Sequence, residues 1–139
     1  MEVSAMVYKA KILVVDDDPD IVGAVSAVLE AHEYQVVSAP DGQQGLDRLR
    51  EERPDLMILD LMMPRMDGFA VCKELLDPRW AKYHVPILIF SSVKGEASNR
   101  RYELETGLSL YADDYVEKPV DPHSLIERVE NLLSSKRRG

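Results

Sequence analysis

Short apolar runs alternate with longer amphipathic segments along the chain. The runs are rich in valine, isoleucine and leucine, and they lie at residues 12–15, 36–38, 56–59, 87–90 and 115–116. Most are continuously apolar rather than alternating with polar residues, which is typical of strands whose two faces are both buried in a parallel sheet. The pattern therefore predicts five parallel strands.

The segments between the runs predict helices. Apolar residues at the spacing i, i+4, i+7, i+8 mark one helical face, first at Ile21, Val25, Val28 and Leu29, and again at Leu125, Val129, Leu132 and Leu133. Weaker helical patterns follow Asp41 and Asp67. Together with the runs, these segments predict five strands and five helices in alternation.

Helix start signals agree with this alternation. Asp18-Pro19 and Asp121-Pro122 each place a capping aspartate before a proline at the first helical position. Alternating strands and helices predict an α/β fold with a doubly wound parallel sheet and helices on both faces. In such folds ligands bind outside the carboxyl ends of the strands, where the strand order reverses. We therefore expect the chemistry at those ends.

Composition narrows the class of protein. The chain has 139 residues, of which 45% are hydrophobic and 30% charged, as expected for one globular domain. Its net charge of −8 gives no long-range attraction to nucleic acid, so direct nucleic-acid binding is not expected. Cys72 is the only cysteine, which excludes an intrachain disulfide and a cysteine-built zinc site. Trp80, between two prolines, is interpreted as a packing anchor before the fourth strand.

Membrane insertion and export are not expected either. The apolar runs are far shorter than the roughly 18 residues that a membrane-spanning helix needs. The first six residues lack the basic region and the apolar stretch of a signal peptide. We therefore expect a cytoplasmic protein.

Acidic residues follow two of the predicted strands. The first strand is followed by Asp16, Asp17 and Asp18, and the third by Asp60. Asp18 is explained as a helix cap, whereas Asp16, Asp17 and Asp60 should converge because the first and third strands are neighbours where the order reverses. Clustered carboxylates raise one another's pKa unless a cation neutralises them. A hard divalent ion with oxygen ligands, Mg²⁺ first, is the natural partner.

Two other strand ends carry groups that suit a phosphoryl group. The fourth strand ends at Ser91, which offers a hydroxyl, and the fifth is followed by Lys118, which offers an ammonium. Such donors and a metal ion can neutralise the oxygens of a transferred phosphoryl group. A carboxylate can accept that group and form an acyl phosphate.

In this order and at these strand ends, the residues resemble the receiver domain of bacterial two-component response regulators, over roughly residues 9–135. The matching stretches are residues 12–18, 59–64, 66–68, 86–92 and 115–119. The resemblance implies a flavodoxin-like (βα)5 fold with strand order 2-1-3-4-5. We expect an N-terminal arm at residues 1–9, the receiver domain at 10–135, and a C-terminal tail or the start of a linker at 136–139.

The resemblance also implies a metal site and a phosphoacceptor. Asp60 would accept the phosphoryl group. Asp17 and Asp60 would bind Mg²⁺ directly, with the backbone carbonyl of Met62 as a third protein ligand. Asp16 would act mainly through a water on the metal.

Three further residues receive roles from the same resemblance. Ser91 takes the place of the family's threonine or serine, Tyr115 takes that of its switch aromatic, and Lys118 pairs with the phosphoryl group. A cis peptide bond between Lys118 and Pro119 is also implied. The separation of Ser91 from Lys118 is several positions longer than the family usually has, so the conformation of residues 93–114 is not predicted.

The implied function is a phosphorylation-controlled signalling switch rather than a turnover enzyme on an external substrate. A sensor histidine kinase or a phosphotransfer protein would supply the phosphoryl group from a phosphohistidine. The output would pass through a downstream effector that the sequence does not identify. The oligomeric state stays open, with a phosphorylation-dependent homodimer as one option.

One enzyme remains as the alternative. Haloacid-dehalogenase-like phosphatases also place an aspartate, a serine or threonine, and a lysine at strand ends, and Asp16 would then be the nucleophile. That family expects a small β-branched residue where Asp20 stands, and an acidic pair after the lysine that does not follow Lys118. The two functions differ in whether Asp60 or Asp16 carries the phosphoryl group.

Overall fold

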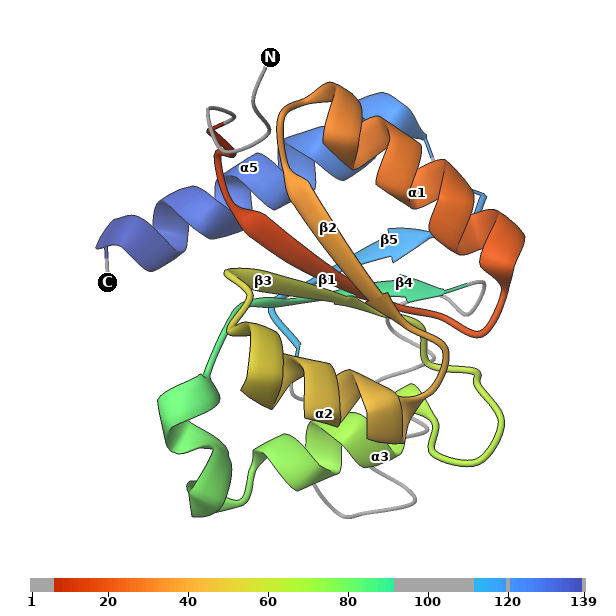
Figure 1. Ribbon diagram of the computed structural model, residues 1–139, viewed down its shortest axis with the longest axis vertical. Coiled ribbons are helices and arrows are strands. Elements are labelled where there is room, and N and C mark those ends of the chain that lie inside the picture. The colour runs from red at the N-terminus through yellow and green to blue at the C-terminus, as the bar shows by residue number, and fades with distance from the viewer. Residues whose placement is uncertain (1–6, 92–111, 120, 139) are drawn as a thin grey trace.

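The computed structural model describes residues 7–91, 112–119 and 121–138, and it has the predicted alternation of strands and helices (Figure 1). The elements in chain order are β1 (Lys11–Val15), α1 (Pro19–Ala31), β2 (Gln35–Ala39), α2 (Gly42–Glu52), β3 (Leu56–Leu59), α3 (Gly68–Leu75), the 3₁₀ helix η2 (Pro78–Tyr83), β4 (Ile87–Ser91), β5 (Asp114–Glu117) and α5 (Pro122–Arg138). The predicted fourth helix falls on residues outside those described.

The five strands form one parallel sheet with the order β2-β1-β3-β4-β5, which confirms the expected fold class and strand order. β1 and β3 are neighbours, and Val15 is paired with Leu59 at their carboxyl ends. The backbone N–H of Asp60 donates to the carbonyl of Val15 over 2.9 Å. This register brings Asp16 and Asp60 out of the sheet side by side.

Two layers of helices cover the sheet, with α1 and α5 on one face and α2 and α3 on the other (Figure 1). Successive strand residues point to opposite faces, so Ile12 and Val14 pack in the core with α1 and α5, while Leu13 and Val15 pack in the core with α2 and α3. Burial on both faces explains why the strands read as continuous apolar runs. Cys72 and Trp80 are both buried in the core under α2 and α3, as expected for Trp80 as a packing anchor.

Aspartates cap the helices where the sequence predicts starts. Asp18 accepts a hydrogen bond from the backbone N–H of Asp20, and Asp67 from that of Ala70. The last helix continues to Arg138, so residues 136–138 extend α5. Within the part of the chain that the structure describes, no helix combines the length and apolar character needed to cross a membrane.

Helix α1 ends without the glycine that commonly marks the end of a helix. The N–H of Tyr34 donates to Leu29 and the N–H of Glu33 to Glu30, each through the backbone. This pair of bonds is the Schellman motif, which places a left-handed residue after the helix. Glycine is common there, but here Glu33 has a φ of 70°.

Candidate functional site

The three predicted carboxylates converge at the carboxyl edge of the sheet. One oxygen from each of Asp16, Asp17 and Asp60 lies within 4.8 Å of the others. Asp16 and Asp60 are each only 3% exposed, whereas Asp17 is exposed. The register of β1 and β3 produces this cluster, since both strands end at the same level.

Lys118 is the cation of the site. Its Nζ lies 2.9 Å from Oδ2 of Asp16 and 3.5 Å from Oδ2 of Asp60. The lysine follows β5, so its side chain extends back across the edge of the sheet toward the two carboxylates. The peptide bond between Lys118 and Pro119 is cis, as expected. One ammonium therefore lies close to two of the three carboxylates.

The charges and the burial perturb the ionisation of the site. Burial is the main reason that the pKa of Asp60 rises to about 6, and the neighbouring charge of Asp16 adds to the shift, while Lys118 opposes it. Burial by itself lowers the pKa of Lys118, but the carboxylates of Asp16 and Asp60 outweigh it, and the net shift is upward. Lys118 is therefore charged at neutral pH, and Asp60 is mostly ionised.

The site fits a hard divalent cation. Its donors are carboxylate oxygens, the ligands that such cations prefer. Among the described residues, the buried Oδ2 of Asp16 has no hydrogen-bond partner, although Lys118 approaches it as an ion pair. A bound cation relieves the excess of negative charge that three clustered carboxylates and one ammonium leave in this site.

Ser91, Tyr115 and Met62 occupy three different positions around this cluster. Ser91 is buried at the carboxyl end of β4, and its carbonyl accepts a hydrogen bond of 3.1 Å from the N–H of Lys118. Tyr115 is half-buried against the core that contains Cys72, and burial raises the pKa of its hydroxyl. Met62 donates its N–H to Oδ1 of Asp60 over 3.3 Å, and its side chain is 46% exposed.

Sequence reasoning missed a contact that anchors the loop after Asp60. Arg65 has a φ of 64°, and its Nη2 lies 3.2 Å from Oδ2 of Asp41. Asp41 is 4% exposed and also caps α2 by accepting from the N–H of Gln44. The sequence marked Asp41 only as the residue before a helix, and no local signal pairs it with an arginine 24 positions later.

A glycine lets α3 approach the site. A Cβ atom added at Gly68 would collide with the carbonyl oxygen of Asp60 and with Cα of Leu61. The N–H of Gly68 donates to the carbonyl of Leu61 over 3.0 Å. The start of α3 is therefore packed directly against the backbone that carries Asp60.

Comparison with known protein families gives one match over most of the chain. Residues 12–130 match the family described as the response regulator receiver domain. The transcriptional regulatory protein PhoP for alkaline phosphatase synthesis, from Bacillus subtilis (strain 168), is 41% identical over 123 residues, which are 88% of this chain and 48% of that protein. The chain thus spans about half the length of the curated relatives it matches.

Solved structures that are similar to this chain are also receiver domains. The BeF3-activated N-terminal receiver domain of Klebsiella pneumoniae RstA is 32% identical, with a TM-score of 0.73, and the match covers 88% of this chain and 97% of that one. The signal receiver domain of a signal transduction histidine kinase from Syntrophus aciditrophicus is 30% identical, with a TM-score of 0.77 and 94% of each chain covered.

Proposed function

Because this chain belongs to the response regulator receiver domain family, whose members are phosphorylation-controlled signalling switches, we propose that Asp60 is its phosphoacceptor. The observation that carries the proposal is the position of Asp60. It is a buried carboxylate at the carboxyl edge of the sheet, within 4.8 Å of Asp16 and Asp17 and 3.5 Å from the ammonium of Lys118.

The contacts of the two buried carboxylates favour Asp60 over Asp16 as the nucleophile. Oδ1 of Asp16 accepts from the N–H of Asp18 over 3.0 Å, and Oδ2 lies 2.9 Å from Lys118. The contacts of Asp60 are longer, 3.3 Å to the N–H of Met62 and 3.5 Å to Lys118. Longer contacts withdraw less electron density from the attacking oxygen. The comparisons also give no support to the haloacid-dehalogenase alternative.

Asp16, Asp17 and Asp60, with the backbone carbonyl of Met62, would hold Mg²⁺. When bound, the ion neutralises negative charge on the phosphoryl oxygens and on the carboxylates around them. The fit rests on the three carboxylates, whose oxygens lie within 4.8 Å of one another and whose negative charge exceeds that of the one ammonium beside them.

The phosphoryl transfer forms one bond and breaks one. A carboxylate oxygen of Asp60 attacks the phosphorus of a phosphohistidine, and the phosphorus–nitrogen bond breaks with its electron pair going to the imidazole. Lys118 pairs with the phosphoryl oxygens, and the hydroxyl of Ser91 donates a hydrogen bond to one of them. The new charge at Asp60 then draws in Ser91 and lets Tyr115 turn, which shifts the population of a bistable surface.

The partners follow from this chemistry. A sensor histidine kinase or a phosphotransfer protein supplies the phosphohistidine, and the switched surface binds a downstream effector. Relatives that are transcriptional regulators, and a matching domain from a histidine kinase, support both a regulator and a kinase as the protein in which such a domain works. The domain itself does not bind nucleic acid and does not turn over an external substrate.

The test uses a small-molecule phosphodonor such as acetyl phosphate. We expect intact-mass spectrometry to show one added phosphoryl group in MgCl₂ and none in EDTA. Size-exclusion chromatography of the same samples reports whether phosphorylation produces a homodimer. Equal labelling in EDTA would refute the metal role, and the absence of labelling under both conditions would refute the switch.

A further inference from the structure

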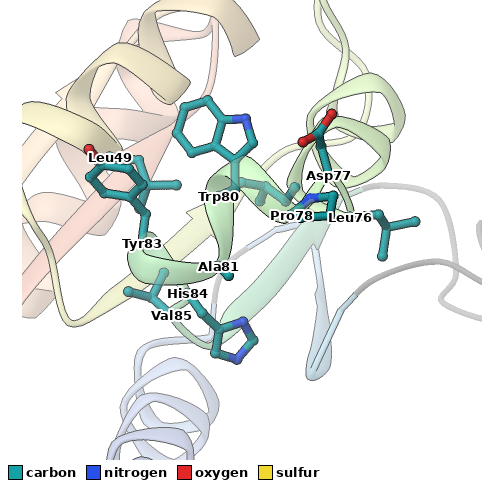
Figure 2. Close-up of a pocket in the computed structure, with 10 residues that line it drawn as sticks. Leu49, Leu76, Asp77, Pro78, Trp80, Ala81, Tyr83, His84 and Val85 are labelled. Carbon is teal, nitrogen blue, oxygen red and sulfur yellow. The ribbon is translucent and has the colours of Figure 1, made fainter.

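A cavity of about 280 Å³ lies at the end of the molecule opposite to Asp60. It is formed by the end of α2, the end of α3, the 3₁₀ helix η2 and the segment that leads into β4. Figure 2 shows Leu49 and Tyr83 on one side of the cavity, Leu76 and Pro78 on the other, and Trp80 between them. Because η2 precedes the amino end of β4, and Asp60 follows the carboxyl end of β3, the cavity is separate from the phosphorylation site.

The cavity has an apolar floor and an apolar mouth. Leu49, Trp80 and Val85 line the floor and are 1%, 7% and 7% exposed. Leu76 lines the mouth and is 42% exposed, which makes it one of the large exposed apolar side chains of the described chain. The indole N–H of Trp80 donates to Glu74 over 3.0 Å, so the ring is fixed in place. Such a concave apolar surface accommodates an apolar side chain.

Two cations beside the cavity have no acidic partner among the residues that the structure describes. The guanidinium of Arg53 lies 4.4 Å and the ammonium of Lys82 5.3 Å from the centre of the Tyr83 ring, which lines the cavity. Arg53 also donates to the backbone carbonyl of Lys82 over 3.2 Å. Within the described ranges, neither cation has a carboxylate within ion-pair distance. By contrast, Arg79 on the other side pairs with Asp77 at 3.1 Å.

The backbone conformation of Arg53 is unusual for an arginine. It ends α2 in the left-handed conformation, with a φ of 49°. Glycine or asparagine is usual in that position because a larger side chain is strained there. The arginine nevertheless stands there, with its guanidinium over Tyr83, and the ammonium of Lys82 lies near the same ring. A carboxylate that binds beside this ring is attracted by both positive charges.

We propose that this cavity is a docking site for an acidic peptide segment of a partner protein. An aliphatic or aromatic side chain of the segment fills the cavity between Leu76 and Trp80, and a flanking carboxylate pairs with Arg53 and Lys82. The local positive charge is complementary to such a segment, although the chain as a whole has a net charge of −8. The site is remote from Asp60, so docking does not require phosphorylation.

The test begins with a random library of 12-residue peptides displayed on phage and selected against the full chain. We expect the enriched peptides to share an apolar residue flanked by aspartate or glutamate. A synthetic peptide of that consensus should shift the Trp80 indole signal in ¹H–¹⁵N NMR spectra. It should bind with the same affinity whether or not the chain has been treated with acetyl phosphate and MgCl₂.

Variants separate the two parts of the site. Arg53→Gln/Lys82→Gln should weaken peptide binding by about tenfold, and Leu76→Glu should abolish it. Arg48→Gln/Lys73→Gln, which removes the same charge from positions outside the cavity, should leave the affinity unchanged. Thermal unfolding of each variant checks that it is folded.

A different occupant of the cavity would give different results in these binding experiments. The proposal is overturned if no consensus appears, if the consensus lacks acidic residues, or if Arg53→Gln/Lys82→Gln binds the peptide as tightly as the parent. It is also overturned if a fluorescent 20-residue oligo-dT binds more tightly than the peptide, or if the parent chain is a dimer that this double variant converts to a monomer. None of these outcomes depends on whether Asp60 is phosphorylated.

Discussion

Lys118 places its ammonium 2.9 Å from Oδ2 of Asp16, although their strands are not neighbours. Asp16 follows β1 and Lys118 follows β5, and both β3 and β4 lie between those strands in the sheet. The lysine therefore crosses the carboxyl edge of the sheet and occupies the position of a counter-ion in the acidic cluster. Where phosphate and a metal ion are absent, this ion pair partly neutralises the site.

Removing that counter-ion should separate metal binding from switching. We expect Lys118→Ala to bind Mn²⁺ at least as tightly as the parent in calorimetric titration, because no ammonium competes for the carboxylates. The phosphorylated variant should show a much smaller change in its NMR spectrum, since part of the phosphoryl charge lacks a partner. Lys82→Ala is the control and should behave as the parent. Loss of metal binding in Lys118→Ala would contradict this role.

Met62 lies two positions after Asp60, the proposed phosphoacceptor, and exposes an apolar side chain. Such a side chain does not position a water for hydrolysis of an acyl phosphate on Asp60, and it would shield the phosphoryl group from water. We therefore expect Met62→Asn to shorten the lifetime of phosphorylated Asp60, by up to about 10²-fold if the amide orients a water. Leu76→Asn, at a similarly exposed but remote leucine, should not change the lifetime. The decay is followed by intact mass, and equal or slower decay in Met62→Asn would count against the idea.

Asp41 joins helix α2 to the loop that follows Asp60. The N–H of Gln44 is the main cause that lowers the pKa of Asp41, and Arg65 adds to the shift. A carboxyl group with a lowered pKa in the folded state stabilises the fold above its unfolded pKa of about 4, and this contribution is lost as the pH falls through the folded pKa.

We therefore expect Asp41→Ala to lower the free energy of unfolding by about 1–2 kcal/mol at pH 7. The difference from the parent should shrink as the pH falls below about 4. Asp47→Ala, on the exposed face of the same helix, should change stability by less than about 0.5 kcal/mol. Urea unfolding at several pH values measures both. An unchanged midpoint for Asp41→Ala at pH 7 would show that the cap contributes nothing.

The strands and the carboxylate cluster could be predicted from the sequence because both signals are local. An apolar run marks a strand, and an aspartate directly after it lies at the strand end whatever the rest of the chain does. The position of Lys118 relative to Asp16 could not be predicted, since it depends on how far a flexible side chain reaches across the sheet. The pair of Asp41 and Arg65 is likewise a contact between two loops.

The helix η2 was missed for a different reason. A 3₁₀ helix of six residues is too short to show a hydrophobic period. Asp77-Pro78 repeats the start signal of Asp18-Pro19 and could have revealed it. The left-handed residues were missed because glycine is the usual signal for that conformation, and glutamate or arginine occupies it here.

Glu33 offers a direct check on the end of α1. Replacing it with glycine removes the strain of a φ of 70° while the backbone bonds of the motif remain. We expect Glu33→Gly to stabilise the fold by about 0.5–1 kcal/mol and to raise the Tm by a few degrees. Glu30→Gly, inside the last turn of the helix, should instead destabilise it by about 0.5–1 kcal/mol. Calorimetry that finds both variants less stable than the parent would contradict the strain that we attribute to Glu33 in this motif.

The identity of the phosphorylated residue is the central claim, and chemical trapping tests it directly. Borohydride reduces an aspartyl phosphate to homoserine, which marks the position in the peptide mass spectrum. After treatment with acetyl phosphate and MgCl₂, we expect homoserine at position 60 in the parent chain and none in Asp60→Asn. Homoserine at position 16, or undiminished labelling of Asp60→Asn, would contradict the account.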